Sequence, residues 1–60
     1  ERVELTPTAD AVLSRLRDGP TSADELVRST GLETGALASA LTELELAGRA
    51  VAAGGVYRAN

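Results

Sequence analysis

The chain has 60 residues, so it can form one small domain at most. It contains no Cys and no His, which excludes a disulfide staple and leaves no plausible zinc site. No metal and no cofactor are expected. The net charge is −3, and the only locally positive segment is 48–60, where Arg49 and Arg58 are the only charged residues. Nucleic-acid modules usually carry a basic face, so this layout disfavours strong phosphate binding.

The first predicted helix follows a mixed leading segment, 1–6, which predicts a short strand or an ordered tail. Thr6-Pro7 is typical of an N-cap followed by proline in the first helical position. Asp18-Gly19-Pro20 then ends the helix. Between these signals, apolar residues recur at i, i+3, i+4 and i+7 and define one buried face: Ala9, Val12, Leu13 and Leu16.

The second predicted helix begins at a capping box, in which Ser22 bonds an early N–H and Glu25 bonds back to the cap. Gly31 suits the left-handed residue that ends this helix. The third helix opens at Glu33 or Thr34 after a short turn, which is the helix-turn-helix signature. The inner face of the second helix is predicted to contain Ala23, Leu26, Val27 and Thr30.

The third predicted helix ends in the stretch LTELELAG, residues 41–48, with Gly48 as its stop. One side of a helical wheel collects the small and aliphatic residues, whereas Leu46 points about 180° away from Leu37. Residues 33–47 contain Glu33, Glu43 and Glu45 and no basic residue, a balance of −3. The predicted inner side consists of Ala36, Leu37, Ala40, Leu41, Leu44 and Ala47.

Two short strands are predicted after the third helix. Residues 49–53 and 56–58 flank Gly54-Gly55, a pair able to adopt positive φ in a two-residue turn, so they predict a hairpin. Three helices and a C-terminal hairpin make a winged helix-turn-helix, a mostly α fold with a small β-hairpin. We expect a single domain over 1–60, and the lack of any Met suggests the C-terminal piece of a longer protein.

Catalysis is not expected, because the chain has no His to act as a base, no Cys nucleophile and no Lys for a Schiff base. A major-groove reader needs Arg, Lys, Asn or Gln on its outer helix face, and here Glu43 and Glu45 would repel phosphate. The candidate DNA contacts are therefore in the wing. Arg49 and Arg58 are either phosphate contacts or solvated strand ends, and Tyr57 either stacks on a base or caps the core.

Glu43 and Leu46 are the candidate protein-interaction residues. An apolar residue on the polar side of a helix can mark a partner surface. The alternative is that Leu46 folds under the wing and packs against Val51 or Val56. That packing is the favoured interpretation from sequence.

These residues resemble the C-terminal winged-helix domain of the bacterial DNA-processing protein A (DprA/Smf) family. The resemblance covers about residues 9–58 and is carried by Gly19-Pro20, Asp24-Glu25-Leu26, Thr30-Gly31-Leu32, the run LTELELAG at 41–48, and Gly54-Gly55 followed by Tyr57-Arg58. The sequence departs from the family pattern at 49–53, which is shorter and richer in Ala than the basic strand expected there.

The resemblance implies a cytoplasmic protein of DNA-mediated transformation and recombination. Such proteins bind incoming single-stranded DNA through a preceding Rossmann-like domain and help to load RecA. We therefore expect an accessory domain whose partner is that Rossmann-like domain or another protein, with RecA reached through the parent protein. Weak or no DNA binding and no membrane contact are expected. The first alternative is an auxiliary DNA-binding module using the Arg49/Arg58 wing, and the second is a fragment of a transcription regulator.

Overall fold

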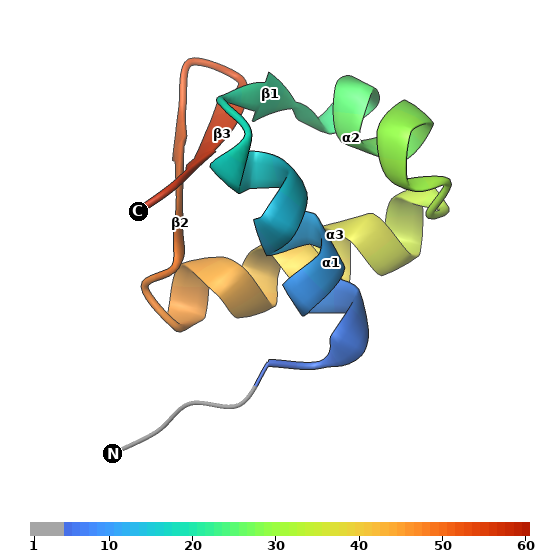
Figure 1. The fold of residues 1–60 in the computed structure, drawn as a ribbon, viewed down its shortest axis with the longest axis horizontal. Coiled ribbons are helices and arrows are strands. Elements are labelled where there is room, and N and C mark those ends of the chain that lie inside the picture. The colour runs from blue at the N-terminus through green and yellow to red at the C-terminus, as the bar shows by residue number, and fades with distance from the viewer. Residues whose placement is uncertain (1–4) are drawn as a thin grey trace.

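A computed structural model describes residues 5–60, so the predicted leading segment lies almost wholly outside the described residues. Three helices, with a short strand between the first two, are followed by a C-terminal hairpin (Figure 1). In chain order the elements are α1 (Pro7–Arg17), β1 (Thr21–Ser22), α2 (Ala23–Thr30), α3 (Thr34–Leu46), β2 (Ala50–Ala53) and β3 (Val56–Ala59).

Helix α1 begins and ends where the sequence predicts. The hydroxyl of Thr6 accepts a hydrogen bond from the backbone N–H of Ala9 (3.2 Å), and Pro7 occupies the first turn. Because the first four N–H groups of a helix have no partner within it, this cap stabilises the helix start by about 1 kcal/mol. Every residue of the predicted apolar face is buried.

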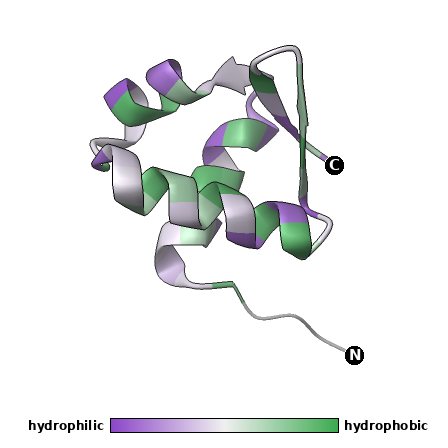
Figure 2. Ribbon diagram, turned by 180° about the vertical axis from the view of Figure 1, so that it is seen from behind, coloured by the Kyte–Doolittle hydropathy of each residue, from purple (hydrophilic) through white to green (hydrophobic). Residues whose placement is uncertain are grey.

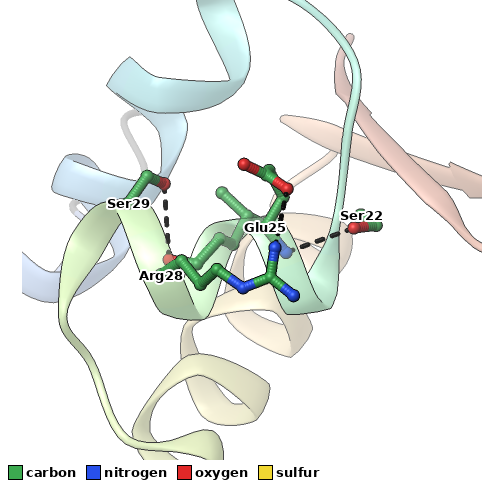
Figure 3. Close-up of polar contacts among 5 residues, drawn as sticks. Ser22, Glu25, Arg28 and Ser29 are labelled. Atoms are coloured by element: carbon green, nitrogen blue, oxygen red, sulfur yellow. Dashed lines mark hydrogen bonds and ion pairs between the residues drawn. The ribbon is translucent and has the colours of Figure 1, made fainter.

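The capping box of α2 forms only in half. Ser22 Oγ accepts from the backbone N–H of Glu25 (3.2 Å), as predicted. The Glu25 carboxylate does not return to the cap, since it accepts from Nη1 of Arg28 instead (3.4 Å; Figure 3). The sequence interpretation is wrong on this second bond, because an Arg one turn along the helix competes for the same carboxylate.

The turn between α2 and α3 is fixed by the side chain of Thr30. Its hydroxyl donates to the carbonyl of Leu26 (2.6 Å) and accepts from the backbone N–H of Leu32 (3.3 Å). Gly31 ends α2 in the left-handed conformation, with φ 74°, as predicted. Leu32 then packs against the core, which sets the angle at which α3 departs.

Helix α3 ends in a Schellman motif. The backbone N–H of Arg49 donates to the carbonyl of Leu44 (2.8 Å), and that of Gly48 donates to Glu45 (3.0 Å). Gly48 has φ 73°, a value that requires a left-handed residue, so the predicted stop is confirmed. The side-chain amide of Asn60 also donates to the carbonyl of Gly48 (2.9 Å), which ties the end of the described chain to this turn.

The hairpin belongs to an antiparallel sheet with strand order β1-β3-β2. Gly54 and Gly55 have φ 61° and 80°, so both central residues of the turn are left-handed, as a type I′ hairpin requires. The third strand, β1, was not predicted. It is only two residues long, and its pairing of Thr21 with Tyr57 and of Ser22 with Val56 has no local signal.

The core lies between α1 and α3 and is closed by α2 and the sheet (Figure 1). It is wholly aliphatic, which agrees with the composition. Tyr57 is half-buried against it, as the core-capping interpretation predicts. Thr21 is the buried polar residue among those described, and the buried hydrophobic residues are Ala9, Val12, Leu13, Leu16, Leu26, Leu37, Ala40, Leu41, Leu44 and Ala50.

Two glycines, Gly35 in the first turn of α3 and Gly48 just beyond its end, are expected to respond oppositely to alanine. A Cβ at Gly35 meets nothing within 4 Å, so Gly35→Ala should stabilise the fold by a few tenths up to about 1 kcal/mol through helix propensity. Gly48→Ala should cost about 1 kcal/mol, because its φ is left-handed. Chemical denaturation of both variants measures the difference, and equal effects would contradict the Schellman assignment.

Candidate functional site

The exposed side of α3 is the surface that a DNA-reading winged helix would present. Figure 2 shows the molecule from behind, with α3 across the front of the fold. Helix α3 (Thr34–Leu46) contains no basic residue, and its first turn contains no acid. Its exposed side chains are small or carry a hydroxyl, apart from one acid and one leucine, and the exposed residues are Thr34, Gly35, Ala38, Ser39, Thr42, Glu45 and Leu46.

Glu43 is bonded to the start of α1. Its Oε2 accepts from the backbone N–H of Thr6 (2.8 Å), and its Oε1 accepts from the Thr6 hydroxyl (3.0 Å). One carboxylate thus fixes the residue that caps α1, and it holds the incoming chain against α3. The sequence predicts Glu43 on a contact surface and gives no signal for this bond, since the two residues are 37 positions apart.

Leu46 is exposed, with 84% of its surface accessible. The favoured sequence interpretation, in which it packs under the wing, is therefore wrong. The chain reverses at Gly48 and places Ala50 against the core, so the hairpin does not cover the outer side of the last helical turn. Leu46 lines a shallow depression together with Ser39, Thr42, Glu43 and Ala47.

A second hollow, the α2–α3 groove, lies on the other side of Thr42. Its volume is about 230 Å³, below the roughly 300–1,000 Å³ of pockets that enclose a small-molecule ligand. The floor is apolar and includes Tyr57, while Asp24 and Glu45 are exposed acids at its edge. The groove is lined by Ala23, Asp24, Val27, Thr34, Leu37, Ala38, Leu41, Thr42, Glu45 and Tyr57.

The α2–α3 groove was not predicted from the sequence. Its walls come from α2, α3 and β3, so it depends on how these elements pack. The one available signal was Glu45, an acid in the last turn of a helix, where the macrodipole disfavours negative charge by about 0.3–1 kcal/mol.

The wing residues do not lie on one face. Successive side chains of a strand point to opposite sides, so Tyr57 faces the groove and Arg58 faces away from it. Arg58 is opposite Val51 in the hairpin, and Arg49 stands two positions before Val51. Both arginines are exposed, and strand alternation places Arg58 on the outer side of the hairpin. Arg49 precedes β2, but its carbonyl accepts from the backbone N–H of Asn60 (2.9 Å), so the pairing continues by one residue and Arg49 falls on the same side, opposite to Tyr57.

Within residues 5–60 no group of three or more His, Cys, Asp or Glu could hold a metal ion. Over the same residues, no helix combines the length and apolar character needed to cross a bilayer. The hollows on this surface are open and bordered by Thr, Ser and acidic side chains.

Three helices with a hairpin after the third, closed by a strand between the first two, define a winged-helix protein. A family model described as the DprA winged helix domain matches residues 2–55. The chain thus belongs to the DprA winged-helix domain family, a non-catalytic fold family. The match ends before β3, so Tyr57 and Arg58 lie outside it. Searches of curated proteins and of solved structures gave no match.

Proposed function

We propose that this domain is a non-catalytic accessory module of a DprA-like protein and works mainly through protein or interdomain contacts. The observation that supports it is the exposed side of α3, which presents Leu46 and Glu45 and carries no basic residue. A buried leucine contributes about 1.5–3 kcal/mol to an interface, whereas phosphate binding needs cations.

In this proposal the chain is a single domain at the C-terminal end of a longer cytoplasmic protein. That parent binds single-stranded DNA, takes part in natural transformation and recombination, and helps to load RecA. The winged helix contacts the parent's Rossmann-like domain or another protein, with RecA reached through the parent as one candidate. The family membership supports this assignment.

The test replaces Leu46 by serine in the full-length parent protein. Self-association, binding of purified RecA and transformation efficiency are compared with the wild type and with Ala11→Ser, a matched change at an exposed position of α1. Loss of the leucine contact should weaken one of the two binding equilibria at least about tenfold. If both equilibria and transformation were unchanged in Leu46→Ser, the proposal would be wrong.

The alternative function is auxiliary DNA binding through the wing. It is favoured by the placement of Arg49 and Arg58 on one exposed side of the hairpin, in the segment of net positive charge. Two phosphate contacts predict weak binding that fades as salt rises. The double variant Arg49→Ala/Arg58→Ala should then lose DNA binding, and a double variant that still bound DNA would rule the alternative out.

A further inference from the structure

Two acids at the edge of the α2–α3 groove lack partners within the described chain. Neither Asp24 nor Glu45 accepts a hydrogen bond or an ion pair from residues 5–60. Asp24 lies in the first turn of α2, where the helix dipole favours it. Glu45 lies in the last turn of α3, where the dipole opposes it, and nothing in residues 5–60 offsets that cost.

Glu43 is a second acid at the same end of α3, and its unfavourable interaction with the helix dipole is offset. Its carboxylate accepts two hydrogen bonds from Thr6, so its position serves the fold. Glu45 has no comparable bond within the described residues, and its carboxylate borders an apolar hollow. An acid that the helix dipole opposes, and that gains nothing inside the fold, is expected where the surface contacts a partner. A cation on that partner would stabilise the Glu45 carboxylate.

The outer side of the hairpin has the complementary chemistry. Arg49 and Arg58 are exposed there, and Val56 lies on the same side with 37% of its surface accessible. No acid occurs in residues 48–60, so this side combines positive charge with apolar side chains. Because Arg58 and Tyr57 point to opposite sides of the sheet, the basic side faces away from the groove of its own chain.

We propose that the α2–α3 groove of one copy receives the outer side of the hairpin of a second copy. Arg58 and Arg49 approach Asp24 and Glu45, and Val56 covers the apolar part of the groove. This deepens the proposed function and rests on it, since it names the partner as another copy of the same domain. The two surfaces differ, so the contact is head-to-tail and does not stop at a dimer unless a ring closes.

Other occupants fit the groove less well. Its volume is too small for a drug-sized ligand but suits one or two side chains. Nucleic acid would bring phosphates to the two carboxylates, which repel them. An arginine-bearing surface with a small aliphatic side chain matches both the charge and the floor, and this chain supplies one.

The test is a charge exchange followed by analytical ultracentrifugation of the 60-residue chain over a wide concentration range. One variant reverses the groove (Asp24→Arg/Glu45→Arg) and the other reverses the hairpin (Arg49→Glu/Arg58→Glu). Each alone should self-associate at least about tenfold more weakly than the wild type, because like charges then meet across the contact. Mixing the two restores opposite charges at every contact, so association should return.

Circular dichroism confirms that each variant is folded, and Asp24→Asn/Glu45→Gln supplies a milder pair if a reversal disrupts α2. A wild type that stays monomeric at high concentration, or reversed variants that associate as the wild type does, would overturn the inference. Loss of RecA binding in Leu46→Ser together with a monomeric wild type would leave the proposed function standing and reject only the second-copy contact.

Discussion

Replacing Leu44 by alanine is expected to unfold much of the domain. Leu44 is fully buried where α3 packs against the rest of the core, and a Leu→Ala change at such a site costs about 2–5 kcal/mol. A 60-residue domain has a total stability of only about 3–9 kcal/mol. The midpoint of thermal unfolding, followed by far-UV circular dichroism, should therefore fall by at least about 8 °C.

Leu46→Ala is the matched control, because it makes the same change two residues further along α3. With 84% of its surface accessible, Leu46 should contribute within about 0.5 kcal/mol to folding. The pair thus separates a leucine that stabilises the core from one available for contact. Comparable losses of stability in both variants would mean that the hairpin covers Leu46 after all.

Glu43→Ala is expected to cost about 1 kcal/mol. The carboxylate accepts two hydrogen bonds from Thr6, and bonds to a charged group contribute about 1.5–3 kcal/mol, but both bonds are exposed to solvent, which lowers their contribution. Losing them frees the residue that caps α1, so the first turn of α1 should fray. Urea unfolding gives the free energy, and hydrogen exchange at the backbone N–H of Ala9 reports the cap itself.

Glu45→Ala is the control for Glu43→Ala, and its effect on stability should have the opposite sign. Removing an acid from the last turn of α3 relieves an unfavourable dipole interaction, so stability should rise by a few tenths up to about 1 kcal/mol. Glu43→Gln should retain part of the Thr6 contact and lie between the wild type and Glu43→Ala. Glu43 and Glu45 variants of equal stability would contradict the assigned role of Glu43.

The helices were predictable because their signals are local. Apolar spacing located the buried faces of α1 and α3, and the caps at Thr6, Ser22 and Gly48 located three helix ends. The double glycine at 54–55 fixed the hairpin turn for the same reason. The strand β1 was not predictable, because two residues are too few to show an alternation of apolar and polar side chains. It is a strand only through its pairing with β3.

The surface was less predictable because it depends on distant contacts. Glu43 has the same local context as Glu45, yet only packing brings it to Thr6. Leu46 was expected to be covered because the hairpin is adjacent in sequence, but Gly48 directs the chain to the core side. The α2–α3 groove needs three elements in place before it exists.

In the proposed function, α3 of this winged helix presents a contact surface in place of a DNA-reading one. Titrating the 60-residue domain into labelled single-stranded and duplex DNA at low and physiological salt, with fluorescence anisotropy as the readout, tests it most directly. We expect no binding at physiological salt, and at low salt at most a weak signal from the two wing arginines. Binding that persists at physiological salt and survives Arg49→Ala/Arg58→Ala would place DNA on α3 and contradict the claim.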